Sequence, residues 1–197
     1  MDPRTFTLVR HGRTTYNDER RVNGDPTIPV ELTDEGRAQC AAVGERLAAR
    51  HFDLAVHTRF PRTRQSLAII LGGRRVPMQV FPEFDDVRLG DLEGRPIDEY
   101  REWRRGRRPD EPPPGEGESR LGVLARYAAG YERLVDAPAA RVLCVAHDVT
   151  VRFMANAAAG HDPLDGPVKR IENAQVVELG EDELRAGIAR MRDRLGW

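Results

Sequence analysis

The sequence predicts an α/β fold, namely a three-layer α/β/α sandwich around a mostly parallel central sheet. Short apolar runs that read as strands alternate along the chain with longer segments of helical periodicity, an order typical of parallel sheets covered on both faces. Several of these runs are apolar on both sides, as buried parallel strands are. The five expected strands are residues 6–10, 54–57, 78–81, 141–146 and 174–179.

Three helices are expected between these strands. Thr33 is positioned to cap the first, and Asp34 and Glu35 suit the positive end of its dipole. A second is expected where apolar residues recur at helical spacing from Leu121 to Leu134. A third is expected to begin just after residues 146–148, directly behind the fourth strand.

The composition indicates a globular protein without a global electrostatic partner. A length of 197 residues suits one domain with one core, so a single domain over residues 1–197 is expected. The net charge of −1 argues against nucleic acid or a membrane surface as the partner. Cys40 and Cys144 are too few for a disulfide framework, no secretory segment is recognisable, and no apolar stretch approaches the ~20 residues of a membrane span. We therefore expect a cytoplasmic protein.

Two segments interrupt the alternation. Residues 23–29 carry Gly24, Pro26 and Pro29 and read as a loop. Residues 104–117 carry four prolines and several glycines, which predicts a loop insertion of a length that is often functional or mobile.

The C-terminal segment repeats apolar residues at helical spacing. Packing on the chain's own core is the expected outcome, with packing on a second copy as the alternative, so the protein is expected to be a monomer or a homodimer. The repeating residues are Leu184, Ile188, Met191 and Leu195.

Ionisable side chains follow four of the expected strands. Because parallel strands end at the same edge of a sheet, these side chains are expected to meet there. Each group alone has an ordinary explanation, such as a surface pair, a helix cap, a core histidine or a solvated turn, but their recurrence at consecutive strand ends favours a site. They are Arg10 with His11, then Arg62, then the cluster Glu83, Asp85 and Asp86, and finally His147 with Asp148.

The first of these positions predicts the chemistry. Arg10 offers a planar fork suited to phosphate, and His11 offers a nucleophile that titrates near neutral pH. Gly12 allows a sharp turn beside a ligand. Fixed positive groups stabilise the charge that spreads over a phosphoryl group during transfer. The pattern predicts an enzyme with a covalent phosphohistidine.

Several motifs resemble those of one known family. Leu8-Val9-Arg10-His11-Gly12, followed by Thr14 and Asn17, resembles the signature of the histidine phosphatase superfamily, also called phosphoglycerate-mutase-like. The resemblance continues in order over about residues 5–180. The further matching segments are Val22-Asn23-Gly24, Leu32-Thr33-Asp34-Glu35-Gly36 with Gln39, Arg62-Thr63-Arg64-Gln65-Ser66, Leu89-Gly90-Asp91-Leu92-Glu93-Gly94, Pro113-Pro114-Gly115 with Glu118-Ser119, Ala146-His147, and Asn173 in the final strand.

This resemblance implies roles for individual residues. His11 is phosphorylated during turnover, and Arg10, Arg62 and His147 hold the phosphoryl group with help from Asn17. The scheme needs no metal and no cofactor, and the five histidines show no close metal-ligand spacing. The partner is a small-molecule phosphomonoester. The residues that line the substrate entrance are Gly12, Arg13, Thr14, Asn23 and Gly24.

The proton donor has three candidates. The family has glutamate four residues before the glycine that here is Gly90, and this position holds Asp86. Asp148 is the second candidate, because one branch of the superfamily uses an aspartate directly after its second histidine. Glu83 is the third, if the local turn differs. The donor protonates the leaving oxygen.

Three departures from the motifs favour a phosphatase over a mutase. Mutases carry glycine at the position of Asp148, the family has serine at the position of Thr58, and Leu92 replaces a tryptophan. The expected function is metal-independent hydrolysis of phosphomonoesters through phospho-His11. The alternatives are a cofactor-dependent phosphoglycerate-type mutase and a non-enzymatic module that binds phosphorylated ligands.

An arginine cluster near residue 104 has two interpretations. A solvated helix end followed by a flexible loop is favoured. The alternative is a patch that recognises an anionic part of the substrate. The cluster consists of Arg101, Arg104, Arg105, Arg107 and Arg108.

Overall fold

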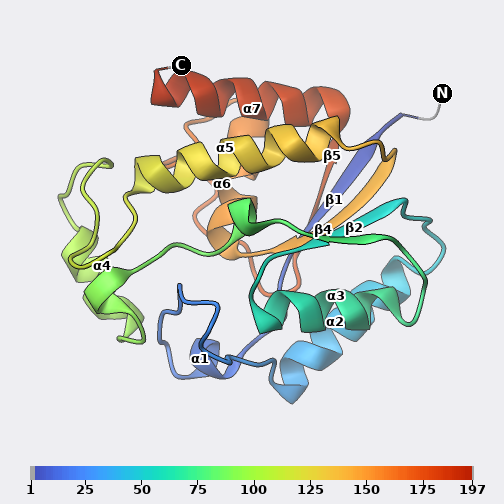
Figure 1. Ribbon diagram of the computed structural model, residues 1–197, viewed down its shortest axis with the longest axis horizontal. Coiled ribbons are helices and arrows are strands. Elements are labelled where there is room, and N and C mark those ends of the chain that lie inside the picture. Colours follow the sequence, from blue (N-terminus) through green and yellow to red (C-terminus); the bar gives the residue numbers. More distant parts are fainter. Residues whose placement is uncertain (1–2, 197) are drawn as a thin grey trace.

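A computed structural model describes residues 3–196 and contains one five-stranded sheet in the order β3-β2-β4-β1-β5. Strands β1 to β4 pair in parallel and β5 pairs antiparallel with β1, which confirms the mostly parallel sheet (Figure 1). The strands are β1 (Thr5–Arg10), β2 (Leu54–His57), β3 (Met78–Val80), β4 (Arg141–Ala146) and β5 (Val176–Gly180).

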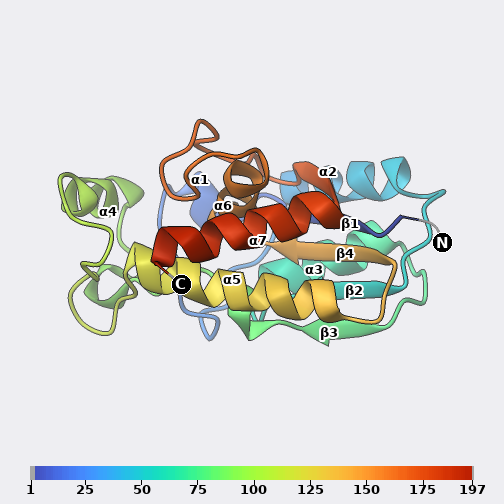
Figure 2. The ribbon, with the colours of Figure 1, turned by 90° about the horizontal axis from the view of Figure 1, so that it is seen from above.

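Helices cover both faces of the sheet, which confirms the three layers. In Figures 1 and 2, α2 and α3 lie on one face and α5, α6 and α7 on the other. The helices are α1 (Thr15–Asp18), α2 (Asp34–Arg46), α3 (Pro61–Leu71), α4 (Ile97–Arg104), α5 (Arg120–Asp136), α6 (Asp148–Ala158) and α7 (Glu181–Leu195), with short 3₁₀ turns at Pro82–Phe84 and Gly90–Leu92.

Alternation along β1 explains the two cores. Phe6 and Leu8 enter the cluster under α5, α6 and α7, while Val9 enters the cluster under α2 and α3. Successive side chains of a strand point to opposite faces, so one buried strand supplies both layers. Each of these three side chains is at most 1% exposed.

Local signals place the helices where the sequence predicts them. The Thr33 hydroxyl accepts a hydrogen bond from Gly36 N at 3.1 Å and caps α2. Helices α5 and α6 also occupy their expected positions. The tail forms α7, whose Leu184 and Met191 are buried against α5 and α6, so it packs on the chain's own core.

Strand β5 begins two residues later than expected. Ala174 has a φ of 57°, in the left-handed region, and cannot continue an extended strand there. Its backbone N–H donates to the carbonyl oxygens of Arg10 and His11 instead. Residues 171–175 therefore form a loop against the end of β1, and Asn173 lies in this loop rather than in the final strand.

The expected loop insertion spans residues 105–119, and Arg104 belongs to α4 instead. Backbone hydrogen bonds from Asp91 to Pro114 and from Glu118 to Arg88 tie this loop to the segment that follows β3. Within residues 3–196, no helix is long and apolar enough to span a membrane.

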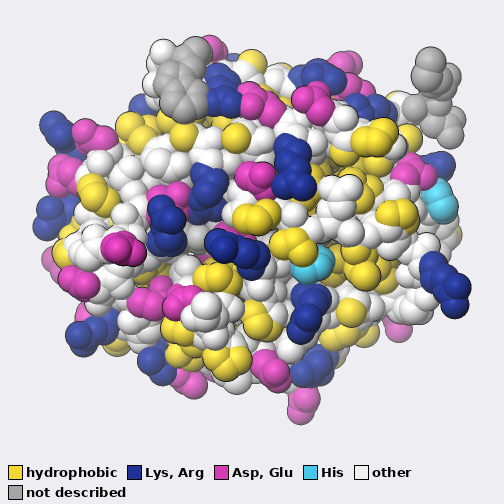
Figure 3. Space-filling model, viewed as in Figure 1, with side chains coloured by type: hydrophobic (Ala, Val, Ile, Leu, Met, Phe, Trp, Pro, Cys, Tyr) yellow, Lys and Arg dark blue, Asp and Glu magenta, His cyan; other side chains and the backbone are white. Residues whose placement is uncertain are grey.

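Most of the arginine cluster is neutralised locally, which favours the solvated interpretation. The pairs lie on the exposed surface around α4, where Figure 3 shows basic and acidic side chains intermixed. Exposed pairs of this kind contribute little free energy. The pairs are Arg101 with Asp98, Arg105 with Glu102, Arg107 with Glu111, and Arg108 with Asp110.

Candidate active site

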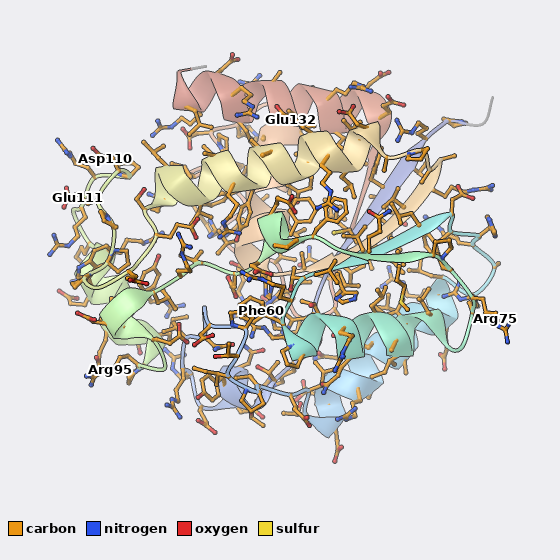
Figure 4. The ribbon with its side chains drawn as sticks, viewed as in Figure 1. Phe60, Arg75, Arg95, Asp110, Glu111 and Glu132 are labelled. Carbon is orange, nitrogen blue, oxygen red and sulfur yellow. The ribbon has the colours of Figure 1, made fainter. Side chains whose placement is uncertain are left out.

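Four of the predicted side chains meet at the carboxyl edge of the sheet. His11 follows β1, Arg62 lies in the first turn of α3 behind β2, and His147 follows β4 as the N-cap of α6. Asp86 comes from the connection after β3. The ring of Phe60, labelled in Figure 4, packs against His147 with ring centroids 4.7 Å apart and lies 4.2 Å from the Arg62 guanidinium carbon.

His11 presents its unprotonated ring nitrogen to this cluster. Its Nδ1 lies 2.7 Å from the carbonyl oxygen of Gly12, so this nitrogen carries the proton and donates. Its Nε2 then accepts a hydrogen bond from Arg62 Nε at 3.2 Å. Burial holds the pKa of His11 well below 6.5, and the charges of Arg62 and Arg10 lower it further. The imidazole is therefore neutral and nucleophilic at Nε2.

Arg62 joins the members of the cluster. Its Nη2 donates to Asp86 Oδ2 at 3.0 Å and to the carbonyl oxygen of Asn23 at 3.1 Å, and Nη1 donates to the Asn23 side chain. The residue is 3% exposed. Burial lowers its pKa, which the nearby Asp86 carboxylate partly offsets. A buried guanidinium with these partners is fixed in one orientation.

His147 is held by a chain of hydroxyl groups. Its Nε2 lies 3.0 Å from Thr58 Oγ1, which lies 2.9 Å from Thr63 Oγ1, and Thr63 donates to the Phe60 carbonyl at 2.9 Å. Because Thr63 uses its proton on that carbonyl, Thr58 donates to Thr63 and accepts from His147. This order assigns the ring proton of His147 to Nε2.

The other nitrogen of His147 faces the cluster. Nδ1 lies 3.3 Å from Asp86 Oδ2 and 3.3 Å from Arg62 Nη2. Burial, followed by the charge of Arg62, holds the pKa of His147 well below 6.5. Because the imidazole is neutral, its contact with Asp86 is not an ion pair. Arg62 Nη2 faces both His147 Nδ1 and Asp86 Oδ2.

Arg10 lies beside His11, and its orientation depends on a distant loop. Its Nη1 donates to the carbonyl oxygen of Ile171 at 2.6 Å. Its Nε is buried and has no hydrogen-bond partner among the described residues. A buried donor of this kind needs an acceptor, and a phosphoryl oxygen is a suitable one.

The structure separates the three candidate proton donors. Asp86 touches Arg62 and His147, and its backbone carbonyl accepts from Arg126 on α5 at 3.3 Å. Glu83 instead binds Arg133 through both carboxylate oxygens, at 3.0 Å each, and faces α5. Asp148 is occupied by the backbone of Ile171 and by Arg152.

The loop from Gly12 to Asn17 forms one side of the site. Gly12 N donates to Ser66 Oγ at 3.0 Å, and a Cβ at residue 12 would lie 2.4 Å from the Gly36 carbonyl oxygen. Thr14 and Asn17 form a capping box at α1. Asn173 Nδ2 donates to Asn17 Oδ1 and to the His11 carbonyl, at 3.1 Å each.

Arg13 is the predicted entrance residue that the structure does not bring into the cluster. Its guanidinium is partly exposed and pairs with Asp18 and Glu35 on the surface. Asn23 and Gly24, in contrast, lie beside Arg62. Gly24 N donates to both carboxylate oxygens of Glu93, at 3.0 and 2.8 Å.

Five further residues support the site and were not among the predicted site residues. Ser66, Glu93 and Asn173 lie within the matching motifs, so sequence position alone could have indicated them. Thr58 directly follows β2, which is a comparable signal. No sequence motif pointed to Arg126. It lies within α5 and donates to backbone carbonyl oxygens of residues 83–86, a contact that only the folded chain creates. The five residues are Thr58, Ser66, Glu93, Arg126 and Asn173.

A cleft of about 290 Å³ opens beside Asp86. Its walls come from the Gly24 loop and from the segment after β3. This position gives room for the organic part of a substrate next to the cluster. The lining includes Gly24, Pro26, Arg59, Arg88 and Leu89.

Comparison with known proteins decides the family. The model of the histidine phosphatase superfamily, branch 1, matches residues 6–194. The chain belongs to this family. Among curated proteins, the chain is similar to the uncharacterized phosphatase PhoE of Bacillus subtilis (strain 168), with 29% identity over 181 residues and 90% of each chain covered.

The chain is also similar to a second curated protein and to a solved structure. The probable phosphoglycerate mutase GpmB of Yersinia pestis (strain Pestoides F) is 30% identical over 162 residues, covering 78% of this chain and 74% of GpmB. A putative alpha-ribazole-5'-P phosphatase structure from Escherichia coli superposes with a TM-score of 0.79 at 21% identity and covers 91% of each chain. This structural similarity supports the fold described above.

Proposed function

We propose that this protein is a metal-independent phosphomonoesterase that acts through a phosphohistidine on His11. The observation that carries the proposal is the neutral His11 whose Nε2 faces the buried Arg62. Nucleophilic catalysis needs a lone pair in the reacting direction and a cationic pocket for the phosphoryl oxygens. Arg10, whose buried Nε has no hydrogen-bond partner within residues 3–196, adds the second cation.

The reaction has two steps. In the first, His11 Nε2 attacks phosphorus, the bond to the leaving oxygen breaks, and Asp86 gives its proton to that oxygen. The N–H at Nδ1 stays bonded to the Gly12 carbonyl, which stabilises the positive phosphoimidazole. In the second, water attacks phosphorus, Asp86 takes the water proton, and the P–N bond breaks to release phosphate.

Two features favour hydrolysis over a mutase reaction. The cleft beside Asp86 gives water room next to the side chain that would deprotonate it. PhoE, a named phosphatase, covers more of the chain than GpmB does. The mutase remains an outcome that the experiment distinguishes.

The test is hydrolysis of a chromogenic aryl phosphate in excess chelator by wild type, His11→Ala and His161→Ala. His161 is exposed and serves as the matched histidine control. We expect chelator-resistant activity that is lost in His11→Ala alone, with acid-labile phosphate trapped on wild type. An inactive wild type that interconverts phosphoglycerates would establish a mutase. Absence of both activities with retained phosphate binding would indicate a binding module.

A further inference from the structure

One buried residue links Asp148 to Arg10. Asp148 Oδ1 accepts a hydrogen bond from the backbone N–H of Ile171 at 2.6 Å. The carbonyl of the same residue accepts from Arg10 Nη1, also at 2.6 Å. Ile171 is 1% exposed, so both of its backbone groups are shielded from water. The two hydrogen bonds form a continuous path from the start of α6 to the end of β1.

The guanidinium of Arg10 depends on this path. Within residues 3–196, the bond to Ile171 is the one hydrogen bond that it makes, and its Nε has none. The direction of Nε is therefore set by where the Ile171 carbonyl lies. Loop 171–175 has no helix or strand pattern of its own. Its far end is held to β1 by Ala174 and Asn173, and its first residue is held by Asp148.

Asp148 is well placed to hold the first residue of this loop. It is the first residue of α6, where the helix dipole favours a carboxylate. Arg152, one turn later, lies 3.3 Å from its second oxygen. Asp148 is also the acid that most strongly raises the pKa of Arg10 against the effect of burial. Both carboxylate oxygens of Asp148 therefore accept hydrogen bonds from groups that hold Ile171 and the first turn of α6.

We propose that Asp148 is a positioning residue, which holds Ile171 so that the Ile171 carbonyl aims the Arg10 guanidinium at the phosphoryl group. The proposal rests on the proposed function, because it presumes that Arg10 binds phosphate. It assigns Asp148 a role in anion affinity and none in proton transfer.

The test compares Asp148→Ala, Asp148→Asn and the control Asp162→Ala. The asparagine variant would keep an amide oxygen for the Ile171 N–H, whereas the alanine variant would not. Asp162 anchors the same connection farther upstream, through the N–H groups of Leu164 and Asp165 at 2.8 Å each, without reaching Ile171. The primary readout is the Kd for inorganic phosphate by calorimetry, which needs no turnover.

We expect the phosphate Kd to rise about tenfold or more in Asp148→Ala, and to stay within about threefold of wild type in Asp148→Asn and Asp162→Ala. The ratio of kcat for aryl and alkyl phosphates is expected to be unchanged in all three. If Asp148→Ala does not fold, the asparagine variant still decides, because a proton donor tolerates neither substitution.

Three outcomes would overturn the proposal. An unchanged phosphate Kd in folded Asp148→Ala removes the link to Arg10. Equal damage by the asparagine and alanine substitutions, greater on the alkyl phosphate, would make Asp148 the proton donor. An equal rise of the phosphate Kd in Asp162→Ala would indicate general loosening of the segment between α6 and β5. A wild type that binds no phosphate would instead contradict the proposed function itself.

Discussion

Arg62 Nε and His11 Nε2 lie 3.2 Å apart, and the arginine donates to the histidine. One buried guanidinium thus touches the expected nucleophile and, through Nη2, the carboxylate of Asp86. Through these two contacts, Arg62 orients the side chains of His11 and Asp86 relative to each other. The proposed reaction needs both groups beside one phosphoryl group, with the nucleophile at phosphorus and the acid at the leaving oxygen.

The assignment of Asp86 as the proton donor predicts dependence on the leaving group. In Asp86→Asn, kcat for an alkyl phosphate is expected to fall roughly a hundredfold or more, and that for an aryl phosphate much less, since an aryl oxide leaves without a proton. Glu83→Gln is the control, because Glu83 faces Arg133. Equal losses on both substrates in Asp86→Asn, or a selective loss in Glu83→Gln, would show that Asp86 is not the donor.

Thr58 is expected to orient His147. Thr58→Val removes the hydroxyl that accepts from His147 Nε2 and leaves a buried N–H unpaired, at a free-energy cost of about 1–3 kcal/mol. We expect kcat on an aryl phosphate to fall about tenfold or more, while Thr58→Ser retains activity. Steady-state kinetics of both variants check this, and equal activity of the valine and serine variants would mean that the hydroxyl has no role.

Acid is expected to destabilise the fold through its two buried histidines. The pKa values of His11 and His147 lie well below 6.5 when folded, so the unfolded chain binds more protons as the pH falls below 6.5. Stability is retained above that pH and falls by up to about 1.4 kcal/mol per pH unit for each histidine below it. Urea unfolding of wild type and His11→Asn at pH 7.5 and 5.5 measures this. His11→Asn is expected to lose less stability than wild type between these two pH values. Equal losses would show that His11 does not have a lowered pKa in the folded protein.

Gly24 is expected to tolerate no side chain. A Cβ there would lie 1.8 Å from the carbonyl oxygen of Val87, so Gly24→Ala must push the Asn23 loop away from the segment that carries Asp86. We expect a loss of stability of about 1–3 kcal/mol together with reduced kcat. Gly122→Ala is the control, because this exposed position of α5 would place a Cβ no nearer than 3.3 Å to another side chain. Normal stability of Gly24→Ala in thermal melts would show that the loop adapts freely.

Much of the fold follows from signals within short stretches of sequence. The apolar runs of β1, β2 and β4, the cap at Thr33 and the apolar spacing of α5 need only near neighbours in the chain. Strand ends then place Arg10, His11, Arg62 and His147 at one edge, because a parallel sheet has one carboxyl edge. Boundaries shift where a distant contact intervenes, as at Ala174, whose N–H turns toward His11.

The sequence by itself determined the order of strands and helices and the set of side chains that end at the carboxyl edge, since periodicity and capping are local. Only the tertiary structure decided which carboxylate joins Arg62, that Arg13 pairs outside the cluster, and that Ile171 connects Asp148 with Arg10. These choices depend on hydrogen bonds between residues far apart in the chain, such as Thr58 with His147. No local pattern encodes such contacts, because their geometry exists only after the layers have packed.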